Sequence, residues 1–104
     1  MTNNNNPVSV TYTDAELRNL VEEYITQQKS DITLKGICSY ILYRAMEEER
    51  TANRGLYGTN QLSQADCGRV SSLLKKIIGE NRLTAASGYG EAFADEAVFA
   101  EVKE

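Results

Sequence analysis

Few residues in this chain are of types that could carry out chemistry, and histidine is not among them. The 104 residues include two cysteines, Cys38 and Cys67, and no histidine. Without histidine there is no Ser-His-Asp triad, no histidine-ligated zinc and no imidazole acid–base chemistry. Two thiolates do not complete a tetrahedral zinc site unless carboxylates help. In a reducing cytosol we expect both cysteines to be small core residues.

The remaining candidate motifs do not make a catalytic centre either. The Gly-Tyr-Gly sequence at residues 88–90 lacks the third glycine of a dinucleotide-binding fingerprint, because Phe93 stands in its place. No Gly-x-Ser-x-Gly elbow is present. Adjacent carboxylates such as Asp95 and Glu96 need not converge on one substrate. We therefore expect a protein that is not an enzyme and that uses no cofactor and no metal.

A cluster of basic residues is the strongest indication of function. The net charge of the chain is −4, yet residues 50–82 carry a balance of +4 between two ends of −4 each. In a helix expected over residues 63–79, Arg69, Ser72 and Lys76 share the outward face at i, i+3 and i+7. A basic face of this kind suits contact with nucleic-acid phosphates.

Three helices are expected to position this face. The first follows a capping box made by Thr13 and Glu16 and runs to about residue 29. The second is expected over about residues 33–50, with Ser30, Asp31 or Thr33 as its cap. The third is expected over about residues 63–79, where Ser63 and Asp66 have the spacing of a weaker capping box. Each repeats apolar residues at helical spacing.

The rest of the chain is less regular. Residues 1–7 are a polar tail that we expect to be disordered, and residues 8–104 are expected to form a single domain. Residues 8–12 alternate apolar and polar side chains, which predicts a short edge strand or an extended arm. Residues 51–61 have the composition of a loop. Residues 82–103 suit a β-hairpin, and a fourth helix in place of its second strand fits nearly as well.

The second helix is apolar on more than one side. Tyr40, Tyr43 and Met46 lie off its main apolar stripe. Such residues are either buried within the monomer or form the seam of a homodimer. These three residues are our candidate dimer interface.

Two or three helices, a basic-faced last helix and a C-terminal hairpin together resemble a winged helix-turn-helix domain. The closest likeness is at residues 68–83, which resemble a recognition helix and the residues leading into the first wing strand. The resemblance implies a mainly α fold with a three-helix core and a small C-terminal β-hairpin. The alternative is an all-α four-helix domain. It also implies groove-facing positions at Arg69, Ser72 and Lys76, with Tyr89 at the wing tip.

The leading functional hypothesis is a small cytoplasmic DNA-binding protein, either a transcriptional regulator or an accessory factor of a mobile element. A homodimer would strengthen its binding. Its nucleic-acid-binding residues would be Arg69, Ser72, Lys75, Lys76, Arg82 and Tyr89. We expect no membrane association, because no apolar stretch has the length of a membrane span and the N-terminus lacks the features of a signal peptide.

The alternative belongs to a different class: an acidic adaptor or inhibitor that binds a basic protein and no nucleic acid. Its binding residues would be Glu47, Glu48, Glu49, Glu91, Asp95, Glu96 and Glu101. A third possibility links the two, because the acidic C-terminal segment could fold over the basic helix and mask it.

Overall fold

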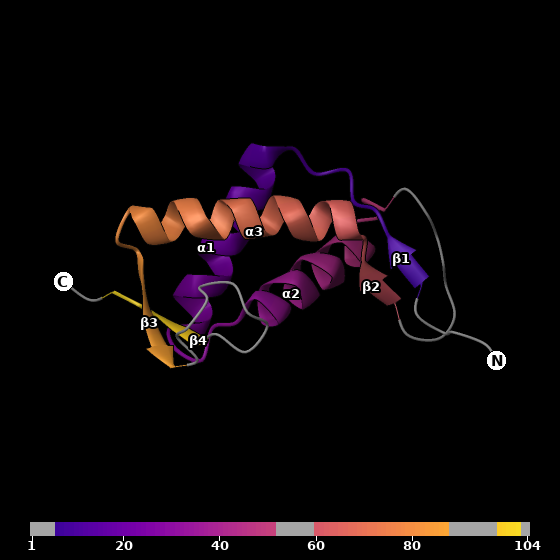
Figure 1. Ribbon diagram of the computed structural model, residues 1–104. Coiled ribbons are helices and arrows are strands. Elements are labelled where there is room, and N and C mark those ends of the chain that lie inside the picture. Colours follow the sequence, from indigo (N-terminus) through magenta and orange to yellow (C-terminus); the bar gives the residue numbers. More distant parts are fainter. Residues whose placement is uncertain (1–5, 52–59, 88–97, 103–104) are drawn as a thin grey trace.

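The computed structural model describes residues 6–51, 60–87 and 98–102, and these residues form a mainly helical fold with small strands (Figure 1). The helices are α1 (Asp14–Gln28), α2 (Leu34–Glu47) and α3 (Gln64–Gly79). Figure 1 shows β1 and β2 beside the N-terminal end of α3, while β3 and β4 lie beyond its C-terminal end.

Each helix begins at a residue whose side chain caps it. The capping box at α1 is confirmed, because the Thr13 hydroxyl accepts a hydrogen bond from the Glu16 amide at 3.1 Å and the Glu16 carboxylate accepts one from the Thr13 amide at 2.8 Å. Thr33 caps α2, and its hydroxyl accepts from the Gly36 amide at 2.9 Å. Ser63 caps α3.

Helix α2 is shorter than the sequence predicts, ending at Glu47 instead of about residue 50. Glu49 has a φ of 56°, in the left-handed region, which turns the chain out of the helix. The Arg50 amide then donates back to the Ala45 carbonyl at 2.7 Å, which satisfies a carbonyl of the last turn.

The three helices enclose one apolar core. Its largest fully buried side chains are Leu17, Val21, Ile25, Ile32, Ile37, Ile41, Val70, Leu74, Ile77 and, from the N-terminal arm, Val8. Cys38 and Cys67 pack against this core but are only partly buried. They therefore lie at the edge of the core, whereas the sequence suggested its interior.

The N-terminal arm is extended and pairs with a strand that the sequence did not predict. Strand β1 (Asn6–Val8) runs parallel to β2 (Asn60–Leu62). Two residues assigned to the tail therefore belong to β1, and two assigned to the loop belong to β2. The prediction failed here because the partner strand, not the local composition, supplies the hydrogen bonds that make these polar residues a strand. The rest of that predicted loop, residues 52–59, and tail residues 1–5 lie outside the described residues.

The C-terminal strands favour the hairpin over the fourth helix. Strand β3 (Leu83–Ser87) pairs antiparallel with β4 (Val98–Glu101). Phe99 of β4 also exchanges two backbone hydrogen bonds with Ile32, at 2.7 and 2.9 Å. Because both side chains are buried, this pairing fastens β4 to the junction between α1 and α2.

Candidate nucleic-acid interface

One side of α3 is exposed to solvent along the whole helix. Its exposed residues are Gln64, Ala65, Gly68, Ser72, Lys75, Lys76 and Gly79. At 100° per residue they fall within about a third of the helix circumference, and we call them the exposed face of α3. The single acidic residue of this helix, Asp66, is 5% exposed and adds no charge to the face.

The three residues that the sequence placed on this face do lie together. Arg69, Ser72 and Lys76 line one hollow of about 360 Å³. Asp14, the first residue of α1, also lines this hollow. A carboxylate therefore stands beside the basic residues, which the spacing along α3 does not indicate.

Arg69 borders the exposed face and its guanidinium is held by the protein itself. Nη2 donates to the Asp14 carboxylate at 2.9 Å and to the Tyr12 carbonyl at 2.8 Å, and Nη1 donates to the Asp66 carboxylate at 3.0 Å. The hydrogen bond to Asp14, and less strongly that to Asp66, raises the pKa of Arg69 despite partial burial. The side chain thus joins α3 to the N-terminal arm and to the start of α1.

Asp66 attaches the N-terminal arm to α3, a role that the sequence did not indicate. Its second carboxylate oxygen accepts from the Val10 amide at 2.9 Å and from the Ser63 hydroxyl at 3.0 Å. The spacing of Ser63 and Asp66 suggested a capping box. The cap is present, but the carboxylate binds the arm, and the Ser63 amide donates instead to the Val8 carbonyl at 2.9 Å.

Arg82, just after α3, is likewise held by carboxylates. It donates to Glu22 of α1 at 2.6 Å and to Glu101 of β4 at 3.5 Å. Glu22 also accepts from Arg18 at 3.1 Å. Partial burial raises the pKa of Glu22, but the hydrogen bonds from Arg82 and Arg18 outweigh it, so the net pKa lies below its usual value.

The two lysines of the exposed face reach further into solvent than these half-buried arginines. Lys75 and Lys76 are both exposed, and Ser72 is exposed one turn before Lys76. Lys76 lies near enough to the Glu80 carboxylate to contribute to lowering its pKa, although Arg18 is the main cause. Tyr89, the predicted wing tip, lies outside the described residues.

The candidate dimer residues are not equivalent. The Tyr40 hydroxyl donates to Glu23 at 2.7 Å, and its ring lies 5.4 Å from the Tyr24 ring, so this side chain is engaged within the chain. The Tyr43 hydroxyl donates to Glu47 at 3.1 Å, but the residue is still 57% exposed, and Met46 is 44% exposed. The exposed apolar surface of α2 is therefore carried by Tyr43 and Met46.

The acidic residues of the alternative hypothesis are also divided. Glu48 accepts from Arg44 and from the Tyr12 hydroxyl, and Glu101 accepts from Arg82. Glu47 and Glu49 are exposed near Tyr43 and Met46 in the sequence, and Glu47 accepts from the Tyr43 hydroxyl at 3.1 Å. Glu91, Asp95 and Glu96 lie outside the described residues.

Metal and membrane features were sought in the part of the chain that the structure describes. Among residues 6–51, 60–87 and 98–102, no three or more Cys, Asp or Glu side chains gather where they could hold a metal ion. No helix in the same ranges combines the length and apolar character needed to span a membrane.

In comparisons with known proteins, no family model, no curated protein and no solved structure matches this chain.

Proposed function

We propose that this chain is a small cytoplasmic DNA-binding protein of the winged helix-turn-helix type, which serves as a transcriptional regulator or mobile-element accessory factor. The observation that carries the proposal is the exposed face of α3, which is free of acidic side chains and bears two lysines and a serine. The order of elements, with three helices followed by an antiparallel pair, supports the same reading.

The small residues of this face favour close approach to a duplex. Ala65, Gly68 and Ser72 are small residues of the exposed face, and a Cβ at Gly68 would meet no atom within 4 Å. A helix of this shape can enter a groove deeply. Lys75 and Lys76, further along, would then meet phosphates, while Ser72 would reach a base edge or the backbone.

The ion pairs of the two arginines narrow the set of contact residues. For Arg69 or Arg82 to bind a phosphate, each would have to leave two carboxylates. We therefore assign the phosphate contacts to Lys75 and Lys76 and give Arg69 the role of fixing α3 against the arm. Two phosphate contacts per chain predict a weak salt dependence, with a log–log slope near −2.

The test is fluorescence anisotropy with random duplex DNA across a salt series. The variant Lys75→Gln/Lys76→Gln is compared with Lys29→Gln/Lys35→Gln, which removes the same charge from other parts of the chain. We expect the first pair to make the slope shallower by about two and the second pair to leave it unchanged. The proposal is overturned if wild type does not bind at low salt, or if both pairs weaken binding equally.

A second candidate function rests on a different observation. Tyr43 and Met46 expose apolar surface on α2 next to the exposed Glu47 and Glu49. An apolar patch with an acidic border suits a protein partner with basic residues, or a second copy of this chain. Analytical ultracentrifugation of wild type and Tyr43→Ser/Met46→Ser distinguishes these. A dimer of the wild type that is lost in the variant supports a homodimer interface at this patch. If wild type and variant are both monomers, a basic protein partner is the remaining candidate for the patch.

A further inference from the structure

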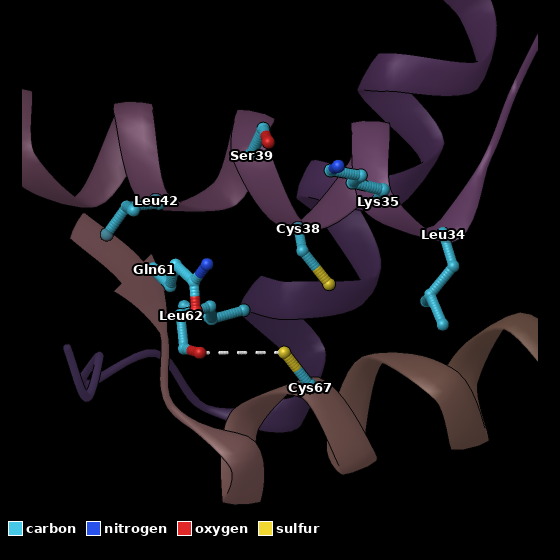
Figure 2. Close-up of a pocket in the computed structure, with 8 residues that line it drawn as sticks. All are labelled: Leu34, Lys35, Cys38, Ser39, Leu42, Gln61, Leu62 and Cys67. Atoms are coloured by element: carbon cyan, nitrogen blue, oxygen red, sulfur yellow. Dashed lines mark hydrogen bonds between the residues drawn. The ribbon is translucent and has the colours of Figure 1, made fainter. Parts of the chain in front are cut away.

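The two cysteines face each other across a groove, although they are far apart in the sequence. Cys38 comes from α2 and Cys67 from α3, and both line a cavity of about 400 Å³ between α2, β2 and α3. Figure 2 shows their sulfurs pointing toward one another into this cavity. Both side chains are partly buried and both thiols are free.

The surroundings show that the two thiols interact. The Cys67 thiol donates to the Leu62 carbonyl at 3.6 Å, which fixes its side chain on the Cys38 side of α3 (Figure 2). Burial, and then the neighbouring Cys67, raises the pKa of the Cys38 thiol to about 12. The groove is otherwise lined by three leucines and by Lys35, Ser39 and Gln61. Burial of the Cys38 thiol disfavours its thiolate, whereas a neutral disulfide carries no such penalty.

We propose that Cys38 and Cys67 are a redox modification site, in which a small disulfide oxidant such as oxidised glutathione converts the two thiols into an intramolecular disulfide joining α2 to α3. One of the two thiols loses its proton, and its sulfur attacks the oxidant to form a mixed disulfide, releasing one reduced thiol. The other protein thiol then loses its proton and displaces the second thiol of the oxidant. Two protein thiols are oxidised and one disulfide of the oxidant is reduced to two thiols.

Either thiol can attack first, because both line the same groove. The other thiol then resolves the mixed disulfide, since the two sulfurs point toward one another across the groove (Figure 2). The cross-link would close a loop of about 30 residues and tie the helix with the exposed face to α2.

The proposal is tested on the full wild-type chain in buffers of reduced and oxidised glutathione, with acid quenching, alkylation and mass spectrometry. We expect a monomer two hydrogen atoms lighter, with a Cys38–Cys67 linked peptide. We also expect an unfolding temperature about 10 °C higher than that of the reduced form. Persistent glutathione adducts on both cysteines, disulfide-linked dimers, or two thiols unchanged in fully oxidised buffer would each overturn it.

Single variants test the mixed-disulfide step. Cys38→Ser is expected to accumulate a glutathione adduct on Cys67, and Cys67→Ser one on Cys38, because each lacks the thiol that resolves the adduct. Circular dichroism first establishes that each variant is folded, and Cys38→Ala and Cys67→Ala replace any that is not. Absence of an adduct from both folded variants would overturn the proposal, because neither thiol could then start the reaction.

Discussion

An arginine forms ion pairs near each end of α3, and the carboxylates that bind the two arginines differ in burial. At the N-terminal end, Arg69 pairs with Asp66, whose side chain is 7% exposed, and with the exposed Asp14. At the C-terminal end, Arg82 pairs with Glu22 and Glu101, which are 27% and 21% exposed. The first arginine therefore neutralises a buried charge, and the second joins two charges that still reach water.

The two ends also differ in how many cationic side chains bind the central carboxylate. Asp66 has one cationic partner among the described side chains, Arg69, and its other oxygen binds the arm. Glu22 has two, because Arg18 also binds it, and Arg18 in turn binds Glu80. Loss of one group should thus leave an unmatched buried charge at the first end, but only redistribute surface pairs at the second.

The largest effect is expected at Asp66. Asp66→Ala removes the ion pair with Arg69 and leaves the buried Val10 amide without its acceptor, which should lower the free energy of unfolding by about 2–3 kcal/mol. Asp66→Asn keeps an oxygen for the amide and should cost clearly less. Urea denaturation measures both, with Ser72→Ala as the exposed control on the same helix. Equal costs for Ala and Asn would show that the hydrogen bond to the arm contributes nothing.

The next prediction compares the arginines directly. Arg69→Ala should lower the free energy of unfolding by about 1–2 kcal/mol, because it leaves the Asp66 carboxylate buried and unpaired. Arg82→Ala should cost about 1 kcal/mol or less, because Glu22 retains Arg18. The measurement is again urea denaturation. A larger cost at Arg82 would contradict the difference between the two ends.

The pH dependence of stability tests the ion pair between Arg82 and Glu22 at the C-terminal end of α3. Its pKa in the folded state lies below the ordinary 4.5, so the stability it contributes is present above that pH and is lost as the pH falls through the lowered value. Arg82→Ala removes a hydrogen bond that lowers this pKa. The gap in unfolding temperature between wild type and Arg82→Ala should therefore narrow from about pH 7 to about pH 3. A gap that stays constant with pH would mean that Glu22 is not stabilised by Arg82.

The smallest effect concerns the glycines at the two ends of α3. Gly68 and Gly79 both have open space where a Cβ would stand. Gly68→Ala should raise the free energy of unfolding by about 0.5–1 kcal/mol, because alanine loses less backbone entropy in a helix. Gly79→Ala should raise the free energy of unfolding by less, since Gly79 is the last residue of the helix. Thermal unfolding measures both. A loss of stability in Gly68→Ala would mean that another part of the protein covers this face.

The starts of the helices could be predicted from sequence because their signals are local. Thr13, Thr33 and Ser63 each satisfy amides within three residues along the chain. Strand β2 could not be predicted, because its partner lies in the N-terminal arm and two of its three residues are polar. The burial of Asp66 escaped for the same reason, since the Val10 amide that it binds is 56 positions away.

The candidate site was predictable in position but not in charge. Helical spacing places Arg69, Ser72 and Lys76 beside one another, and the structure has them around one hollow. Their charge balance depends on Asp14, which only the packing of α1 against α3 brings there. Likewise Arg82 meets Glu22 through tertiary contacts alone. The charge pattern of the sequence therefore predicted that both arginines form a basic surface, whereas the structure pairs them with carboxylates.

The parallel pairing of β1 with β2 has a consequence for how the chain folds as it leaves the ribosome. The register matches Asn6 with Asn60 and Val8 with Leu62, and the arm is then held by Asp66. The arm is synthesised before α1 and α2, but its partners β2 and Asp66 are synthesised only after both helices. Until then the apolar side chains Val8, Val10 and Tyr12 have no strand or carboxylate to close over them. Docking of the arm is thus a late event, and the nascent chain exposes these three side chains until β2 and α3 have been synthesised.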